Sequence, residues 1–453
     1  MPIDVSSIRP RSTHPAPEPA KAPAAASLNQ PSATPLVPGS AVAKVLAAVW
    51  AGAPVTILDA PPGSGKTESV VNLVAHLTEL AGLRVLIQVV TRNQGVALAH
   101  RLVSQVPARH IEVAIKGLVP GSLPAGLYAG KRGANVDRAL VTIKTVAACA
   151  FRSPSDFDII VVDEAYQATY ADIMLGASKA PQIVCVGDPG QIGPIVTIDT
   201  SIFQNLSDAP HRPAPEVLAT LEGAMRFSLE RTFRLGPASA TAIAPLYDFP
   251  FTSACVPRRL VGTGDSNRHH TYGELEAIEL PAATSPDDLS VLRVVADRTA
   301  ELIHTRLYWP GTDGEETRHT AEGDIAVVLA RNSQVSIVKG LLAERELDRV
   351  VVSTADRIQG AEYPIVVALD SSVGNDGWSD HAMSNGRLCV MASRHTTHLT
   401  WVHDTAWPKV TAGRSTTAVR ARAVRSALVA NKVVPLKDGG VSQVEHGANS
   451  DVA

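Results

Sequence analysis

Three short segments in the first half of this 453-residue chain combine residue types that can hold phosphate and a divalent cation. They are residues 60–67 (APPGSGKT), 163–167 (DEAYQ) and 187–191 (GDPGQ). Each follows an apolar run typical of a buried β-strand, and strand ends are where open α/β sheets bind ligands. In this order, the three segments predict a site that holds ATP with Mg²⁺ and senses the terminal phosphate.

Residues 60–67 fit the P-loop pattern, although the first position is Ala60 instead of glycine. Glycines let backbone N–H groups approach phosphate, a lysine reaches the β- and γ-phosphates, and a hydroxyl at the helix N-terminus binds Mg²⁺. We therefore predict Thr67 as a metal ligand. The predicted nucleotide contacts are Pro62, Gly63, Ser64, Gly65, Lys66 and Thr67. The alternative is a glycine-rich turn that fits the pattern by chance.

A pair of carboxylates, Asp163 and Glu164, ends another apolar run. At a strand end, Asp163 can hold the Mg²⁺ shell, and Glu164 can act as a general base toward the attacking water. Gln191 follows a further apolar run and could hydrogen-bond the γ-phosphate or its water. The alternatives are a solvated acidic pair and, for Gly-Asp-Pro-Gly, an ordinary turn.

Apolar runs alternate with helical patterns over most of the chain, which is typical of parallel sheets covered on both faces. The runs are residues 55–58, 85–90, 139–143, 158–162, 182–186, 325–329, 350–352, 365–369 and 399–402. Helical spacing predicts one helix after the P-loop, ending near Gly82, and another over residues 289–303. The predicted fold class is therefore α/β, with mostly parallel sheets.

Composition and patterning suggest the domain boundaries. Residues 1–38 are rich in Pro, Ala and Ser and predict a disordered arm. Residues 39–228 form a first predicted α/β domain with a small insertion near residues 95–138, and residues 229–410 form a second. Residues 411–453 are expected to form a C-terminal helix and a loose tail.

Bulk composition narrows the class of protein and of partner. An apolar content of 45% and a charged content of 19% fit a soluble globular protein, and a net charge of −3 means that any polyanion site must be local. Four dispersed cysteines without a CxxC pair argue against a zinc site and indicate a reducing, cytoplasmic setting. The sequence shows no apolar run of membrane-spanning length, so no membrane partner is expected.

With these motifs, residues 45–405 resemble superfamily 1 helicases of the 5′-to-3′ branch, which includes the Upf-like and Dna2-like enzymes. The similar segments are residues 163–167 (motif II), 187–191 (motif III), 229–234 (LERTFR, motif IV), 354–362 (TADRIQGAE, motif V) and 387–394 (RLCVMASR, motif VI). The resemblance implies two tandem RecA-like P-loop domains with the nucleotide in the cleft between them.

The resemblance also implies roles for residues in the second half of the chain. Arg234 and Arg394 would neutralise the γ-phosphate, Arg394 as an arginine finger of the kind worth about 10³ to 10⁵ in rate. Gly360 and Glu362 would contact the nucleotide. The alternative for any single arginine is a solvated or salt-bridged surface residue.

Nucleic-acid contacts are implied by the resemblance and favoured by local charge. Residues 91–94 resemble motif Ia, and the implied contacts are Thr91, Arg92, Asn93, Thr142, Lys144, Thr145 and Thr354. Positive charges outnumber negative ones between residues 92 and 152, where Lys131 and Arg132 lie between glycines, so this region could follow a phosphate backbone. A solvated basic face is the alternative. We expect the aromatic residues Tyr128, Tyr166 and Phe233 to pack rather than stack on bases.

These observations predict an ATP-dependent helicase or translocase, a monomer that hydrolyses ATP with Mg²⁺ and moves on single-stranded DNA or RNA. Residues 42–54 contain no glutamine that could read adenine, so the preference for ATP over GTP stays open. Two alternatives also stay open: a P-loop ATPase switch that remodels a protein partner, and a nucleic-acid-binding module with a decayed motor.

Overall fold

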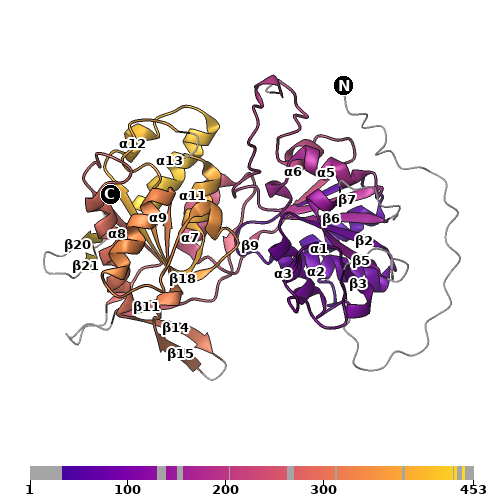
Figure 1. Cartoon of the computed structure of the whole chain (residues 1–453), viewed down its shortest axis with the longest axis horizontal. Coiled ribbons are helices and arrows are strands. Elements are labelled where there is room, and N and C mark those ends of the chain that lie inside the picture. The colour runs from indigo at the N-terminus through magenta and orange to yellow at the C-terminus, as the bar shows by residue number, and fades with distance from the viewer. Residues whose placement is uncertain are drawn as a thin grey trace, which may run out of the picture. The chain divides into compact units, whose positions relative to one another are not determined.

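The computed structural model describes residues 33–129, 139–149, 157–203, 205–262, 270–311, 314–379, 383–431, 433–435 and 441–443. These residues divide into two compact units, whose elements are labelled in Figure 1. Unit 1 comprises the described residues up to Ala60, Gly65–Pro189 and Gly193–Leu229. Unit 2 comprises Pro61–Ser64, Gly190–Ile192 and the described residues from Glu230 onward.

Among the described residues of unit 1, eight strands form one sheet in the order β4-β3-β5-β2-β6-β7-β1-β8. Every pairing in this sheet is parallel. The strands are β1 (Val55–Asp59), β2 (Val85–Val89), β3 (Ile111–Val113), β4 (Tyr128–Ala129), β5 (Val141–Thr145), β6 (Ile159–Asp163), β7 (Gln182–Gly187) and β8 (Met225–Ser228). The predicted parallel α/β architecture is confirmed for this unit.

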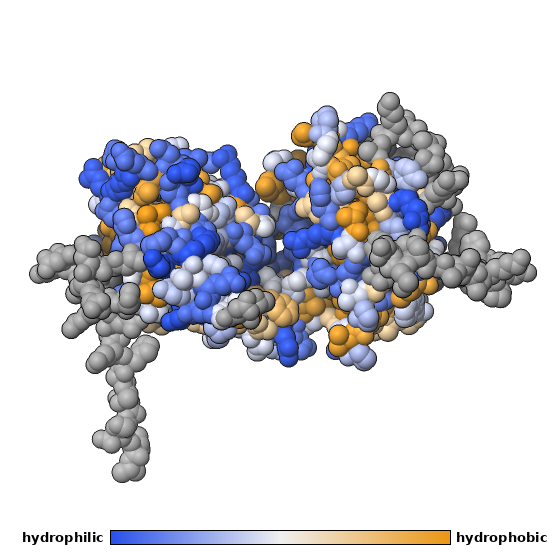
Figure 2. All heavy atoms as spheres, turned by 90° about the horizontal axis from the view of Figure 1, so that it is seen from below, coloured by the Kyte–Doolittle hydropathy of each residue, from blue (hydrophilic) through white to orange (hydrophobic). Residues whose placement is uncertain are grey.

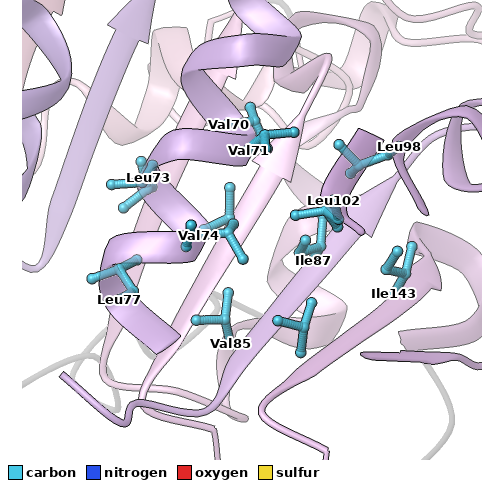
Figure 3. Packing of buried hydrophobic residues seen from close by; sticks show 14 of the residues in the cluster. Val70, Val71, Leu73, Val74, Leu77, Val85, Ile87, Leu98, Leu102 and Ile143 are labelled. Carbon is cyan, nitrogen blue, oxygen red and sulfur yellow. The ribbon is translucent and has the colours of Figure 1, made fainter. Parts of the chain in front are cut away.

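Helices cover both faces of the unit 1 sheet. They are α1 (Ala41–Trp50), α2 (Lys66–Ala75), α3 (Arg92–Leu102), α4 (Val146–Cys149), α5 (Tyr170–Ala177) and α6 (Ala214–Leu218). Alternate strand residues pack on opposite faces: Val85 and Ile87 of β2 join a core with α1, α2 and α3, whereas Leu86 joins a core with α4, α5 and α6. Figure 3 shows the first of these cores, in which Leu73 and Leu102 contribute from α2 and α3.

In the described part of unit 2, five parallel strands form a sheet in the order β13-β19-β18-β16-β17. They are β13 (Leu275–Leu280), β16 (Ile325–Leu329), β17 (Val351–Thr354), β18 (Tyr363–Leu369) and β19 (His395–Asp404). The helices are α7 (Pro237–Ile243), α8 (Leu289–Ile303), α9 (Asn332–Ala343), α10 (Ala355–Ile358), α11 (Asn385–Ala392), α12 (Trp407–Val410) and α13 (Thr416–Val429). Val366 packs with α7, α11 and α13, and Val367 packs with α8 and α9, so this sheet is also covered on both faces.

An antiparallel sheet that the sequence patterns did not predict adds to unit 2. Its order is β12-β11-β14-β15, from the strands β11 (Arg259–Gly262), β12 (Thr271–Tyr272), β14 (Thr305–Gly311) and β15 (Gly314–His319). All residues of β15 are exposed, which removes the apolar alternation that would reveal a strand in the sequence. Two short ladders complete the described strands: β9 (Arg231–Thr232) with β10 (Thr252–Ser253), and β20 (Val433–Pro435) with β21 (Val441–Gln443).

Several predicted element boundaries shift in the structure. The helix after the P-loop continues from α2 as a π-helical turn, His76–Leu80, and ends before Gly82, whose φ is +68°. The region predicted as an insertion contains β3 and β4, which belong to the main sheet, and most of α3, which packs on the core of unit 1. At the end of the predicted arm, Leu36 packs on the unit 1 core and Thr34 N donates to Gln105 Oε1 at 3.2 Å. The earlier part of that arm and most of the predicted tail lie outside the described residues.

Figure 2 shows hydrophilic residues spread over the visible face of each unit, with smaller groups of apolar residues between them. Among the helices that the structure describes, none has both the length and the apolar character required to cross a bilayer.

Candidate nucleotide-binding site

The three phosphate-type motifs follow three strands that are neighbours in the unit 1 sheet. β1 pairs with β7, and β7 pairs with β6, so Asp59 lies opposite Gly187, and Asp163 lies opposite Val186. Because the strands are parallel, their carboxyl ends meet at one edge, and the segments that follow them start from the same place. The sheet order therefore brings together the P-loop, the carboxylate pair and the Gly-Asp-Pro-Gly turn.

The P-loop depends on two glycines in the left-handed region. Gly63 has a φ of +71° and Gly65 a φ of +81°, conformations that side chains with a Cβ rarely adopt. Gly65 is the N-cap of α2, which starts at Lys66, so Thr67 lies in the first helical turn as predicted. The exposed backbone N–H groups of such a turn and the helix dipole favour a phosphate group.

Lys66 already pairs with the predicted general base. Its Nζ lies 2.6 Å from Glu164 Oε1, and both side chains are mostly buried. Burial lowers the pKa of Lys66, but the carboxylates of Glu164, Asp188 and Asp163 outweigh this effect and raise the pKa above its ordinary value. The lysine is therefore a permanent cation in a carboxylate-rich setting, which suits a group that must bind a polyanion with a cation beside it.

Asp163 and Thr67 have the chemistry of a Mg²⁺ site. Burial, followed by the neighbouring Glu164, raises the pKa of Asp163 to about 6, despite the nearby Lys66. A divalent cation bound beside this carboxylate would favour its charged form. Mg²⁺ commonly takes only one or two protein oxygens and completes its shell with waters and substrate phosphates. The Thr67 hydroxyl and the Asp163 carboxylate fit that requirement.

Glu164 is held in an unusual backbone conformation. Its φ and ψ are +56° and +40°, in the left-handed region that is uncommon for any residue except glycine. Glu164 N donates to Asp163 Oδ1 at 3.1 Å, and a 3-10 turn, Ala165–Gln167, follows at once. Strained residues of this kind concentrate at functional sites, where the surrounding contacts maintain them.

In unit 2, side chains from motifs IV, V and VI converge. Arg234 pairs with Glu362, and its Nη1 donates to the carbonyl oxygen of Ser393 at 3.3 Å. Arg394 is 1% exposed, and its Nη2 donates to Ser393 Oγ at 3.0 Å. Gly360 has a φ of +89°, so a glycine is needed at this turn. Side chains that the resemblance assigns to the nucleotide thus lie close to one another in unit 2, and their contact with the phosphates stays a prediction.

His395 is a member of this arginine cluster that sequence reasoning missed. It is fully buried, and its Nε2 lies 2.7 Å from Ser239 Oγ. Burial, together with the charges of Arg234 and Arg394, lowers its pKa to about 3, so the imidazole is neutral at ordinary pH. A neutral ring beside two guanidinium groups adds no further repulsion. Its position directly after Arg394 was the available signal.

Gln191, the last residue of motif III, belongs to unit 2 and contacts motif V there. Gln359 Nε2 donates to Gln191 Oε1 at 3.3 Å, which links the predicted γ-phosphate sensor to the turn that contains Gly360. A Cβ on Gly386 would lie 2.6 Å from the carbonyl oxygen of Gln191, so this glycine permits close backbone approach. Arg387, the first residue of motif VI, is held by Asp356 through two hydrogen bonds of 3.0 Å.

The predicted nucleic-acid contacts divide into exposed and buried groups. Arg92 and Asn93 are exposed at the start of α3, after Thr91, which is the N-cap and accepts from Gln94 N at 3.2 Å. Lys144 and Thr145 are half-buried at the end of β5.

Two other predicted nucleic-acid contacts are buried. Thr142 is 3% exposed and donates to Glu112 Oε2 at 3.3 Å, so its side chain lies within the sheet layer, away from solvent. Thr354 is also buried, at the end of β17. Lys131 and Arg132 lie outside the described residues. Of the aromatic residues expected to pack, Tyr166 is buried, but Phe233 is 57% exposed, so that expectation is wrong for Phe233.

Comparison with known proteins relates the chain to P-loop proteins. A family model described as an AAA domain matches residues 41–231. The DNA-binding protein SMUBP-2 of Mus musculus is 23% identical over 268 residues, which cover 55% of this chain and 25% of that protein. The chain therefore spans about a quarter of the length of this curated relative.

Viral helicase structures also show a partial resemblance. The structure of PRRSV helicase has a TM-score of 0.41 and 15% identity, and covers 80% of this chain and 54% of that one. Arterivirus nonstructural protein 10 (helicase) in complex with DNA has a TM-score of 0.41 and 15% identity, and covers 80% and 64%. TM-scores this low do not by themselves establish a common fold. The AAA-domain match, the similarity to SMUBP-2 and the motifs at adjacent strand ends support a P-loop NTPase that resembles superfamily 1 helicases.

Proposed function

We propose that this chain hydrolyses ATP and uses the energy to move along single-stranded DNA or RNA, as a translocase or helicase. The observation that carries the proposal is the pairing of Lys66 with Glu164, with Asp163 adjacent, at the ends of neighbouring strands. A phosphate-binding lysine, a metal-binding carboxylate and a general base are the parts that ATP hydrolysis requires.

In the proposed reaction, the backbone of Gly63–Gly65 and the amine of Lys66 bind the phosphates of ATP. Entry of the triphosphate draws Lys66 away from Glu164, which frees that carboxylate to accept a proton from the attacking water. Mg²⁺, held by Thr67 and Asp163, would neutralise charge on the β- and γ-phosphate oxygens. Glu164 is thus inhibited by its own lysine until substrate arrives.

Arg234, Arg394 and Gln191 complete the proposed machinery. Arg234 would exchange Glu362 for the γ-phosphate, because a phosphate bears more charge than the carboxylate that now holds the guanidinium. Arg394 would stabilise the charge that develops on the transferred group, and Gln191 would orient the water. Exposed residues at the start of α3, Arg92 and Asn93, are the proposed contacts to nucleic acid.

The test is steady-state ATP turnover by the full chain with single-stranded DNA, single-stranded RNA or blunt duplex, followed by unwinding of duplexes tailed at either end. We expect turnover that requires Mg²⁺ and rises on addition of a single strand. Unwinding from the 5′ tail alone would establish the polarity. Turnover that is indifferent to every nucleic acid would instead favour an ATPase that remodels a protein partner.

A further inference from the structure

Within unit 1, three polar side chains form a closed network beneath the site. Tyr166 donates its hydroxyl proton to Asp59 Oδ1 at 2.7 Å, and Arg226 Nη2 donates to the same hydroxyl oxygen at 2.9 Å. Arg226 Nε donates to the other carboxylate oxygen, Asp59 Oδ2. The polar groups of the three side chains thus find hydrogen-bond partners in one another, as buried polar groups require.

The three residues come from three parts of the site. Asp59 is the last residue of β1, directly before the P-loop, and Tyr166 lies two residues after Glu164. Arg226 lies on β8, the edge strand that pairs with β1. The network therefore fixes the turn that carries the general base against the strand that carries the phosphate loop.

Burial indicates that Tyr166 has a task other than contact with a base or nucleotide. Asp59 is 2% exposed and Tyr166 is 4% exposed, so neither side chain presents a surface to a ligand. Burial and the adjacent Asp59 raise the pKa of Tyr166 well above its ordinary range, which keeps the phenol protonated as a hydrogen-bond donor. The hydroxyl, which is the group that distinguishes tyrosine from phenylalanine, makes both hydrogen bonds of Tyr166 in the network.

Close packing leaves the Tyr166 ring little freedom. A Cβ on Gly187 would lie 2.9 Å from Tyr166 Cδ2 and 3.1 Å from Ala165 N, so the third motif presses directly on the turn of the second. Gln167 N donates to the carbonyl oxygen of Glu164 at 2.8 Å and closes that turn. The left-handed conformation of Glu164 is thus held by contacts on the residues that immediately follow it.

Arg226 also has an electrostatic task. Asp59 places a buried negative charge next to a loop that must bind a triphosphate, and an uncompensated carboxylate there would repel it. The guanidinium of Arg226 neutralises Asp59, while its own side chain is 49% exposed and can be changed without opening the core.

We propose that Tyr166, Asp59 and Arg226 are positioning residues that align Glu164 with the phosphate-binding loop for ATP hydrolysis. This inference rests on the proposed function. It predicts that loss of the network slows the chemical step more than it weakens nucleotide binding, because misplacement of a catalytic group by about 1 Å can cost about a hundredfold in rate.

The test compares Tyr166→Phe with Tyr170→Phe, a matched change at a buried tyrosine on α5 that lies outside the network. We expect Tyr166→Phe to lower kcat about tenfold or more, with little change in the KM for ATP, in affinity for a fluorescent ADP or in the thermal unfolding midpoint. Tyr170→Phe should match wild type in all four measurements.

Arg226 supplies a second, independent test on an exposed side chain. Arg226→Gln should lower kcat, and Arg226→Lys should restore part of it by keeping the charge without the two-pronged geometry. The double variant Tyr166→Phe with Arg226→Gln should lose less than the product of the two single losses, because both act on one network.

The outcomes separate this inference from the proposed function. If wild-type protein hydrolyses ATP and Tyr166→Phe turns over at the same rate, the positioning role is wrong and the ATPase stands. If kcat, nucleotide affinity and unfolding midpoint all fall together, the network is only structural, which also overturns the inference. Folded wild-type protein without any turnover would instead remove the proposed function.

Discussion

Lys66 of unit 1 and Arg394 of unit 2 are both predicted to meet the γ-phosphate, yet the protein holds them in different ways. Lys66 retains some exposure and pairs with Glu164, a carboxylate that the reaction itself would use. Arg394 is 1% exposed, and its guanidinium donates a hydrogen bond to the hydroxyl of Ser393, beside the neutral His395. A paired cation can exchange its carboxylate partner for phosphate. A buried guanidinium has already lost its water before any phosphate binds, and its charge must be stabilised by neighbouring protein groups. Loss of Lys66 should therefore affect function alone, and loss of Arg394 should affect function and stability together.

The largest expected effect comes from Lys66→Ala. Without the amine, the phosphates lose their main cation, so ATP turnover should fall below detection and affinity for a fluorescent nucleotide should weaken. The unfolding midpoint should stay close to that of wild type, because both side chains of the Lys66–Glu164 pair retain some exposure to solvent. Lys44→Ala, at an exposed position on α1, is the matched control and should turn over normally. Normal turnover by Lys66→Ala would remove the P-loop assignment.

Arg394→Lys sharpens the comparison when it is measured beside Arg425→Lys. Both arginines are fully buried, and Arg425 forms a salt bridge at 2.9 Å with Asp370, which is not a predicted site residue. Arg394→Lys should lower kcat by about 10³ or more while nucleotide affinity changes little. Arg425→Lys should lower the unfolding midpoint and leave the kcat of folded protein near the wild-type value. A loss of affinity alone in Arg394→Lys would contradict the finger role.

A smaller effect is expected from Gly63→Ala compared with Gly52→Ala. Both glycines have a left-handed φ, +71° and +85°, but a Cβ on Gly52 meets nothing within 4 Å, whereas one on Gly63 would lie 2.2 Å from Arg234 Cβ. Gly52→Ala should cost about 1 kcal/mol of unfolding free energy, the cost of a left-handed residue. Gly63→Ala should cost more and should also weaken nucleotide binding. Urea unfolding measures the loss of unfolding free energy, and nucleotide titration measures the loss of affinity. An equal loss of unfolding free energy in the two variants would contradict the close approach of Gly63 to Arg234.

A pH dependence of stability should arise from two buried histidines. Burial, with nearby arginines, lowers the pKa of both His395 and His398 to about 3. An unfolded chain binds a proton at each near pH 6.5, so it holds more protons than the native state between these values. Stability should therefore fall as the pH drops below about 6.5, by up to about 1.4 kcal/mol per pH unit for each histidine. Denaturant midpoints measured between about pH 3 and 6.5 should change less steeply with pH in His398→Gln than in wild type. An identical dependence on pH would contradict the lowered pKa of His398.

Local sequence patterns predicted the main strands and helices of this fold, because the residues within each such element already show its characteristic apolar spacing. The runs at residues 158–162 and 365–369 appear as β6 and β18, since buried parallel strands are apolar on both faces. The antiparallel strands β14 and β15 escaped prediction because exposed residues such as Glu315 and Arg318 give no apolar alternation. Strand β8 was missed for the same reason, since its four residues include the exposed Met225 and Arg226.

The candidate site was predicted where motifs are contiguous and missed where partners are distant in sequence. Lys66, Asp163 and Glu164 were found from short patterns, but Asp59 and Arg226 are separated by 167 positions and share no pattern. Thr142 was expected to face nucleic acid, and only the paired strands show that it is buried against Glu112. A side chain's surroundings are set by tertiary packing, which a motif does not encode.

We propose that this chain couples ATP hydrolysis to single-stranded nucleic acid. The most direct measurement is the rate of ATP hydrolysis by the full chain, with Mg²⁺, before and after addition of saturating single-stranded DNA or RNA. We expect a basal rate that at least one of these strands raises and that Lys66→Ala abolishes. A basal rate that neither strand changes, in protein shown to be folded, would contradict it.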